Sequence, residues 1–265
     1  ISPVEVIENA LARIDEVNPK LNGFCFVYAE EAIEKAHLAE SEVQSGNSIG
    51  PLHGVPFAIK DFTPTAGKRT TMGSKIFEHW IPDQNPPVVE RLLQAGGIMI
   101  GKTTTPEFGW KGVSQSPLTG ITSNPWRLGH NAGASSAGAG VGAAAGYGPL
   151  HQGSDGAGSI RMPASLCGIA GLKPTYGRVS RYGLVAFASS LDQLGPMGRD
   201  VDSVARLLQV LAGPAPKDAT SLDTPVPLYT EQPDQPLQGL RIGICKEHDR
   251  EGLDEEVRQT IHNAL

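Results

Sequence analysis

The pattern of apolar and polar positions begins with an amphipathic helix over residues 2–18. Ile7, Leu11 and Ile14 recur at helical spacing and lie on one face. Ser2 followed three residues later by Glu5 predicts a capping box, in which each side chain accepts a backbone N–H group at the start of the helix. The chain is therefore expected to open with a well-capped helix.

Further along the chain, short apolar runs alternate with helical patterns. The predicted strands are residues 54–61 (GVPFAIKD), 98–101 (IMIG) and 239–246 (GLRIGICK). The predicted helices are residues 28–45, 85–97 and 254–265. Strands that alternate with helices are typical of an α/β sheet layered with helices. We therefore expect the α/β class and a single domain over residues 1–265, with the proline-rich segment 213–239 as a surface excursion.

Composition narrows the class of protein further. Hydrophobic residues make up 39% of the 265 residues and charged residues 19%, which is typical of a globular protein. No apolar run approaches the roughly 20 residues that a membrane-spanning helix needs. The net charge of -6 argues against direct nucleic-acid binding, because such binding depends on Lys and Arg that neutralise phosphates. We expect no contact with a membrane and no direct binding of nucleic acid.

The cysteines and the N-terminus bear on where the protein works. Cys25, Cys167 and Cys245 are odd in number, widely spaced and free of any C-x-x-C pair, which fits a reducing compartment and no structural zinc. The N-terminus has no basic stretch followed by an apolar one, so it carries no visible secretory signal. We therefore expect a cytoplasmic protein. Because Ile1 is not a methionine, we also expect further residues before it.

Two glycine-containing stretches match motifs of other enzymes but lack the required context. Residues 131–146 (NAGASSAGAGVGAAAG) have glycines at nucleotide-binding spacing, yet no strand precedes them and no acidic residue closes a βαβ unit. Close packing of a helix against a sheet explains Gly138 and Gly142 better. Residues 46–50 (GNSIG) match a hydrolase nucleophile elbow by letter, but they lie in a polar loop after a helix, so we interpret Ser48 as a turn residue.

The remaining polar features suggest covalent catalysis. Lys60 ends a buried strand. Burying a lysine there costs free energy unless its amine is neutral or its ammonium is paired with an acid such as Asp61. A neutral lysine could accept a proton from one serine, and that serine could take a proton from a second one, which then becomes the nucleophile. Ser135 and Ser159 both lie in glycine- and alanine-rich backbone. These residues alone leave open whether Lys60 is a base or an ion-pair partner.

The stretch 154–163 (SDGAGSIRMP) has the backbone freedom to bring amides close to reacting atoms. Consecutive N–H groups at Gly156, Ala157, Gly158 and Ser159 could converge on a developing oxyanion. The first three are therefore candidate oxyanion-hole residues.

The histidines have no comparable pattern. His53, His130 and His151 are scattered without metal-ligand spacing. Because Lys60 already offers a base, we expect none of them in a catalytic triad.

With these residues in place, the chain resembles the amidase signature family. The segments HGVPFAIKD (53–61), GASSAGA (133–139) and GSDGAGSIRMP (153–163) are similar to the family's lysine, serine-rich and nucleophile segments, and they occur in the family's order. The resemblance extends from about Gly54 to Cys245. It implies an amidase-signature fold, with a mixed β-sheet core covered by helices on both faces, and an enzyme that uses no cofactor and no metal.

The resemblance also implies a role for each residue. Ser159 is the expected nucleophile, Ser135 the bridging serine held by an unusual cis peptide, and Lys60 the base. We expect Asp155 to hold its loop through backbone amides and Arg161 to pair with Asp155 or brace the loop. The full expected set comprises Lys60, Ser135 and Ser159 as catalytic residues, Gly156, Ala157 and Gly158 as the oxyanion hole, Ser136, Asp155 and Arg161 as supporting residues, and Phe108, Gly109 and Trp110 as substrate-binding residues.

Four alanines depart from the family's pattern. Ala134, Ala137 and Ala139 replace glycines or a serine of the serine-rich segment, and Ala157 replaces one glycine of the usual pair. Alanine lacks the freedom of glycine at positive φ, so these changes could alter the bridging loop or the oxyanion hole slightly, although we still expect activity. The chain is also shorter than family domains, and we expect it to be truncated at both ends, most of all at the C-terminus.

The leading functional prediction is a hydrolase that cleaves the C–N bond of a carboxamide, or a related ester or carbamate, through a serine acyl-enzyme. Its expected partner is a small-molecule amide, and a homodimer is an open alternative to a monomer. Residues 107–126 resemble stand-alone amidases, and segments that face the substrate say more about function than scaffold segments do.

Two alternatives stay open. Residues 183–197, 216–227 and 240–247 resemble the A subunit of the glutamyl/aspartyl-tRNA amidotransferase, which releases ammonia from glutamine and acts with partner subunits. The other alternative is a catalytically inactive scaffold.

Overall fold

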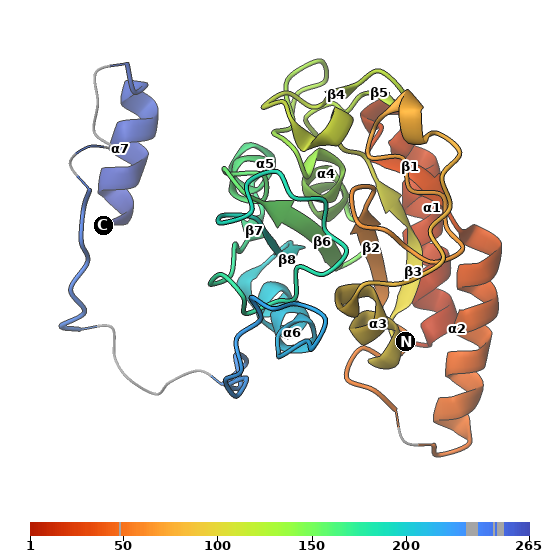
Figure 1. Ribbon diagram of the computed structural model, residues 1–265. Coiled ribbons are helices and arrows are strands. Elements are labelled where there is room, and N and C mark those ends of the chain that lie inside the picture. The colour runs from red at the N-terminus through yellow and green to blue at the C-terminus, as the bar shows by residue number, and fades with distance from the viewer. Residues whose placement is uncertain (48, 232–237, 246, 248–251) are drawn as a thin grey trace. The chain divides into compact units, whose positions relative to one another are not determined.

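The computed structural model describes residues 1–47, 49–231, 238–245, 247 and 252–265. These residues form two compact units, Ile1–Thr230 and Glu231–Leu265. The first unit contains a six-stranded sheet with helices on both faces (Figure 1). Taken by itself, the second unit contains helix α7, Glu255–Ala264, where the sequence predicts a helix. No helix in the described ranges is long and apolar enough to cross a membrane.

The central sheet is mixed, as expected, and its strand order is β1-β3-β2-β6-β8-β7. Its strands are β1 (Phe24–Val27), β2 (Pro56–Lys60), β3 (Ile98–Thr103), β6 (Leu150–Asp155), β7 (Ala170–Gly171) and β8 (Gln193–Gly198), and a separate ladder joins β4 (Gln115–Ser116) to β5 (Gly120–Ile121). Strand β2 runs parallel to both β3 and β6, whereas the other neighbours are antiparallel. Because β2 and β6 are parallel neighbours, their carboxyl ends, at Lys60 and Asp155, meet at one edge of the sheet.

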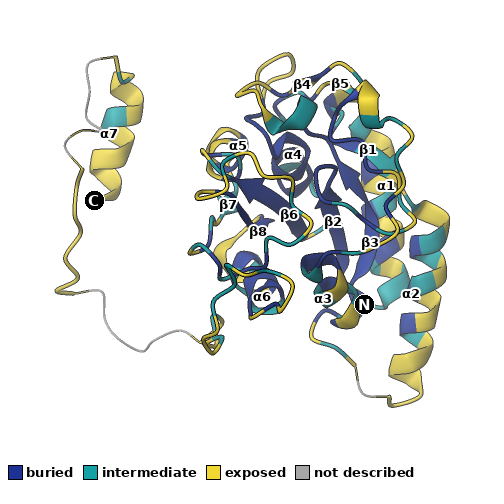
Figure 2. Ribbon diagram, in the orientation of Figure 1, coloured by how far each residue is buried: buried dark blue, intermediate teal, exposed yellow. Residues whose placement is uncertain are grey.

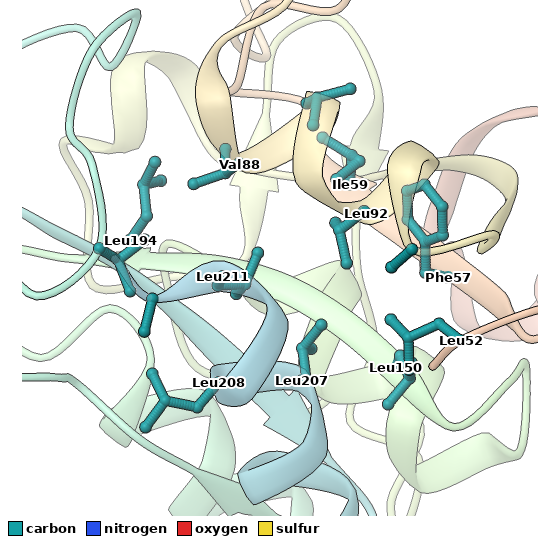
Figure 3. Close-up of a cluster of buried hydrophobic side chains, with 14 of the residues drawn as sticks. Leu52, Phe57, Ile59, Val88, Leu92, Leu150, Leu194, Leu207, Leu208 and Leu211 are labelled. Carbon is teal, nitrogen blue, oxygen red and sulfur yellow. The ribbon is translucent and has the colours of Figure 1, made fainter. Parts of the chain in front are cut away.

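Helices cover both faces of this sheet, which confirms the expected layers. They are α1 (Pro3–Leu21), α2 (Ala29–Gln44), α3 (Pro87–Gln94), α4 (Ala137–Ala145), α5 (Arg161–Cys167) and α6 (Val201–Leu211), with the 3₁₀ turns η1 (Lys75–Phe77) and η2 (Glu107–Gly109). Phe57 and Ile59 of β2 pack with α3 and α6 on one face (Figure 3), whereas Ala58 packs with α1 and α2 on the other. The alternation follows from the two-residue period of a strand and leaves the sheet buried between the layers (Figure 2).

Helix α1 begins as the sequence predicts. Ser2 N–H donates to Glu5 Oε2 at 2.7 Å, and Glu5 N–H donates to Ser2 Oγ at 3.2 Å, which completes the capping box. Ile7 and Ile14 are buried on the inner face. The helix continues to Leu21, a few residues beyond the predicted end, because Pro19 lies in its last turn without breaking it.

The strand predicted at 239–246 is wrong. Residues 241–245 join no ladder within the described ranges, and the side chains of Leu240, Ile242 and Ile244 are more than half exposed. Alternating apolar residues form a strand only when a neighbour offers its N–H and C=O groups, and the described residues supply no such neighbour to this segment. Lys246, at the end of this prediction, and Ser48, the predicted turn residue, lie outside the described residues.

Helix α4 contacts the sheet closely, as its small residues predict. A Cβ atom on Gly138 would lie 2.1 Å from the carbonyl oxygen of Gly23 and 2.3 Å from the amide nitrogen of Thr104. A Cβ atom on Gly142 would lie 2.5 Å from the buried ring of His151. The tract is therefore a packing surface as well as the segment that leads the chain from Ser135 into the helix.

This packing predicts the cost of one methyl group. We expect Gly138→Ala to lower the free energy of unfolding by about 1–3 kcal/mol or more, because the new Cβ meets backbone atoms that cannot move aside. The loss should occur although alanine is the better helix former by about 1 kcal/mol. Urea unfolding measures the change. Gly112→Ala is the matched control, since no described atom beyond its own residue and its two chain neighbours lies within 4 Å of its Cβ position, and equal stability of the two variants would contradict the packing account.

Candidate active site

A pocket lies at the edge of the sheet where β2 and β6 end. Six of the residues predicted from the sequence line it: Phe108, Gly109, Ser135, Gly156, Ala157 and Ser159. Six further lining residues were not predicted: Phe62, Ser154, Leu184, Val185, Phe187 and Asp192. A larger hollow beside Arg91 and Lys217 is lined by no serine or threonine, so it offers no comparable chemistry. The parallel pairing of β2 and β6 thus brings together hydroxyl groups from distant parts of the sequence.

Lys60 lies behind this pocket and is completely buried. Its Nζ donates to Ser135 Oγ at 2.6 Å and to Ser154 Oγ at 2.9 Å, and no carboxylate forms an ion pair with it in the part of the chain that the structure describes. Burial lowers the pKa of Lys60 to about 7, although the charges of Asp155 and Asp192 act in the opposite direction. A lysine in this setting is neutral for part of the time near neutral pH and can then accept a proton.

A second buried lysine, Lys102 on β3, shows the opposite arrangement. Its Nζ donates to Thr63 O, Thr65 Oγ1 and Thr70 Oγ1, which uses all three protons of an ammonium group, and it lies 3.8 Å from Asp61. Burial lowers the pKa of Lys102 to about 8, and the charge of Asp61 opposes this shift. Asp61 therefore pairs with Lys102 and not with Lys60. Lys60 was left open as either a base or an ion-pair partner, and the ion pair with Asp61 is absent.

Ser135 and Ser136 lie at the start of α4. The peptide bond between Ala134 and Ser135 is cis, as the family resemblance implies. Ser136 Oγ donates to Ser154 O at 3.2 Å and accepts from Ser154 N at the same distance, while Ser136 N–H donates to Ser159 O at 3.1 Å. Ser136 therefore ties the start of α4 both to β6 and to the loop that carries Ser159.

Asp155 holds the loop after β6 in place. Its carboxylate accepts from Gly158 N–H at 2.6 Å and Ile160 N–H at 3.1 Å, and it forms a two-pronged pair with Arg161 at 3.0 Å. Burial alone would raise the pKa of Asp155, but the hydrogen bonds from Arg161 and from the backbone outweigh it, so the pKa lies below its usual value. Both contacts expected for this residue, to the backbone and to Arg161, are present.

The amide donors at the loop differ from the expected set at one position. The Gly158 N–H is already donated to Asp155, so it does not point freely toward the pocket. The N–H groups of Gly156, Ala157 and Ser159 have no acceptor among the described residues. Ser159 is half-buried, and its hydroxyl has no hydrogen-bond partner in that same part of the chain; no hydrogen bond joins it to Ser135 Oγ. Contacts of this kind often tighten only when substrate binds.

The four alanines that depart from the family's pattern need no glycine-like conformation. Ala134, Ala137, Ala139 and Ala157 all lie outside the positive-φ region, in contrast to Gly158, whose φ is 120°. The steric argument against alanine applies only at positive φ. The backbone at these positions is therefore open to alanine without strain.

Of the three predicted substrate-binding residues, Trp110 does not line the pocket. The residue is 72% exposed, and its ring packs against that of Phe187, with the centroids 5.1 Å apart. Phe108 adopts φ of 51°, and this turn at η2 brings Gly109 so close to Ser135 that a Cβ there would lie 3.1 Å from Ser135 Oγ. Trp110 is therefore exposed beside Phe187, a residue of the pocket wall, and does not line the pocket itself.

No histidine lines the pocket. His53 contacts the carbonyl oxygen of Ala39, His130 is exposed, and His151 is buried beneath α4, where burial lowers its pKa to about 4. Within the described ranges no group of three or more His, Cys, Asp or Glu side chains is placed to bind a metal ion. The polar chemistry at the pocket comes from Lys60, the hydroxyls and the carboxylates.

The fold and the site together define a class of protein. It is an α/β protein in which a buried lysine is hydrogen-bonded to serine hydroxyls at the edge of a mixed sheet. The sequence model of the Amidase family matches residues 5–265, and the chain belongs to this family. It is 47% identical over 262 residues to the glutamyl-tRNA(Gln) amidotransferase A subunit of Synechococcus sp. (strain CC9605), covering 98% of this chain and 53% of that protein. The chain thus spans about half the length of the curated relatives it matches.

Solved structures of the same fold agree. One, from an "unexpected vestigial protein complex" that "reveals the evolutionary origins of an s-triazine catabolic enzyme", has a TM-score of 0.83 at 36% identity, over 87% of this chain and 50% of that one. The native peptide amidase from Stenotrophomonas maltophilia has a TM-score of 0.80 at 32% identity, over 86% of this chain and 48% of that one.

The setting of Lys60 predicts the pH dependence of any activity. A general base works in its neutral form, so the rate should rise with pH through the pKa of Lys60, about 7, and level off in the mildly alkaline range. Lys60→Ala should abolish this rise of the rate with pH and most of the rate itself. Lys60→Arg should lose as much activity, because a guanidinium group stays protonated and cannot act as the base. Rate profiles of these variants, with His53→Gln and His130→Gln as controls, make the test. If the rise of the rate with pH persists in Lys60→Ala but disappears when a histidine is substituted, the base is that histidine.

Proposed function

We propose that this chain carries the bond-cleaving site of an amide hydrolase in which Ser159 is the nucleophile, Ser135 the proton relay and Lys60 the base. The observation that carries the proposal is the contact of Lys60 Nζ with Ser135 Oγ at 2.6 Å, made by a fully buried lysine without a carboxylate partner among the described residues. Such a lysine is a poor structural cation but a useful base at neutral pH. The triad places no demand on a cofactor or metal.

In the proposed acylation step, Ser159 Oγ attacks the carbonyl carbon of the substrate and forms a C–O bond. The Ser159 proton passes to Ser135, while the proton of Ser135 passes to neutral Lys60. The free N–H groups of Ala157 and Ser159, together with that of Gly156, stabilise the oxyanion, whereas Gly158 shapes the loop through Asp155. This assignment revises the expected oxyanion set.

The tetrahedral intermediate then collapses. The C–N bond breaks as the nitrogen takes a proton from Ser135, which is resupplied by protonated Lys60, and the amine or ammonia leaves. Water attacks the remaining ester by the same relay, and the carboxylic acid departs. Ser154, which also accepts from Lys60 Nζ, keeps the amine of the base directed toward the pocket.

The second candidate function is ammonia release from glutamine within a larger complex. It is favoured by the 47% identity to a relative named as the A subunit of glutamyl-tRNA(Gln) amidotransferase. Partner subunits belong to this candidate, and no direct contact with nucleic acid is proposed. The same triad serves both candidates, since each cleaves a carboxamide C–N bond. A third candidate, an inactive scaffold, predicts no reaction at Ser159.

Several broader expectations remain proposals. The family match over residues 5–265 supports one domain across the chain. The free cysteines, Cys25, Cys167 and Cys245, fit a reducing compartment and therefore the cytoplasm. A homodimer would be detected by the mass of the protein in solution.

The proposed nucleophile is tested by Ser159→Ala. Because only the hydroxyl is removed, turnover of an amide panel that includes glutamine should fall below detection while thermal unfolding stays unchanged. The parent protein should be labelled by a fluorophosphonate and the variant should not. Activity within about tenfold of the parent in the folded variant would place the nucleophile elsewhere. Hydrolysis of glutamine only with co-expressed partner subunits would favour the second candidate, and an unlabelled, inactive parent would favour the scaffold.

The relay role of Ser135 makes a different prediction. Ser135→Ala should slow acylation by roughly 100- to 10,000-fold, the range for loss of one acid-base group, yet leave slow labelling of Ser159 by the fluorophosphonate. The labelling rate is measured by quenching the reaction at a series of times and recording the intact mass of the protein. If the variant is labelled as fast as the parent, Ser135 has no part in proton transfer.

A further inference from the structure

Asp192, which none of the sequence patterns pointed to, lies in the wall of the pocket. Its side chain is only 5% exposed, and Oδ2 accepts the N–H groups of both Phe187 and Ala188 at 2.7 Å. These bonds hold the loop that precedes β8, from which Leu184 and Phe187 also line the pocket. One oxygen of the carboxylate is thus fully used in shaping this wall.

The second oxygen, Oδ1, is free. It has no hydrogen-bond partner among the described residues, and a Cβ atom on Gly156 would lie only 2.3 Å from it. Oδ1 therefore lies against the loop that offers the free amide donors, in a pocket also lined by Ser135 and Ser159. No other lining residue of this pocket carries an ionisable side chain. A bound group that supplies an N–H would give this carboxylate oxygen a donor.

The chemistry of an amide matches this arrangement. Its carbonyl oxygen accepts hydrogen bonds, as the free N–H groups of Ala157 and Ser159 require, and its nitrogen donates them, as Oδ1 requires. An ester has the carbonyl but no N–H, and its alkoxy oxygen would face the carboxylate with lone pairs.

We propose that Asp192 Oδ1 accepts a hydrogen bond from the N–H of the scissile amide and so makes the site select amides over esters. The inference rests on the proposed function and extends it from a reaction type to a substrate preference. In the tetrahedral intermediate the same bond fixes the nitrogen, so that its lone pair is left to receive the proton from Ser135. Asp192 is then a specificity-determining residue that touches the substrate.

Asp192→Asn separates this role from the shaping of the loop. The asparagine carbonyl oxygen can still accept from Phe187 and Ala188, because it has two lone pairs, but the other atom becomes an NH₂ group that donates. The loop is therefore kept and the acceptor for the amide is lost. The charge of Asp192 also raises the pKa of Lys60, so rates are compared on the alkaline plateau, where Lys60 is neutral in both proteins.

The experiment measures kcat/KM for an amide and an ester that share one acyl group. We expect Asp192→Asn to lower the ratio of amide to ester turnover by about tenfold or more, the size of a lost hydrogen bond to a charged group. The rate of fluorophosphonate labelling on the plateau should stay at the parental value, because the probe offers no N–H. The ratio is taken on one enzyme sample, so it does not depend on how much of the variant is folded.

Asp218→Asn is the matched control. Asp218 also uses its carboxylate to accept backbone N–H groups, from Arg181 at 2.6 Å and Thr220 at 3.0 Å, but it does not line the pocket. Its substitution should leave the amide-to-ester ratio unchanged.

Two outcomes overturn the inference alone. An equal loss on amide and ester would reduce Asp192 to a loop-shaping residue, and an unchanged ratio would remove it from substrate recognition. A parent that hydrolyses neither substrate and is not labelled at Ser159 would instead remove the proposed function, and this inference with it.

Discussion

The site depends on the burial of Lys60 against hydroxyl groups instead of a carboxylate. Lys102 lies at the same depth on the neighbouring strand, yet three oxygen acceptors and the nearby Asp61 suit it to remain an ammonium. Depth alone therefore does not distinguish the proposed base from a structural lysine. The partners differ: desolvation penalises the charged form of both, and of these two lysines only Lys102 has a carboxylate within 4.0 Å among the described residues, whereas Asp155 and Asp192 act on Lys60 without forming an ion pair.

The fold positions these partners through close backbone packing and through carboxylates that accept backbone N–H groups. Parallel pairing of β2 with β6 brings Ser154 to Lys60, and the glycines of α4 let the helix approach closely enough to place Ser135 on the other side. Asp155 then orders the loop after β6, and Asp192 orders the loop before β8. In each case one carboxylate accepts several backbone N–H groups and so holds the loop around it.

The residues proposed for catalysis all lie in a chain that is shorter than its relatives. The chain belongs to the amidase family and spans about half the length of its curated relatives, yet every residue proposed for bond cleavage lies within the unit Ile1–Thr230. Relatives that share the fold include a peptide amidase and one component of a tRNA amidotransferase. The proposed relay of lysine and serines is compatible with either context, because a fold does not by itself fix the function that its site serves.

The sequence by itself determined the features that are local or strictly ordered. The cap of α1, the buried strand that ends at Lys60, and the order of the lysine, Ser135 and Ser159 can be read from spacing and motif, because each depends on neighbours in the chain. Only the tertiary structure decided the rest. It paired Asp61 with Lys102, left Trp110 exposed and outside the pocket lining, left residues 241–245 without a ladder among the described residues, and brought Ser154 and Asp192 to the site. These outcomes depend on which groups from distant segments meet in space, and hydrogen-bond and ion-pair partners of that kind leave no periodic trace in one sequence.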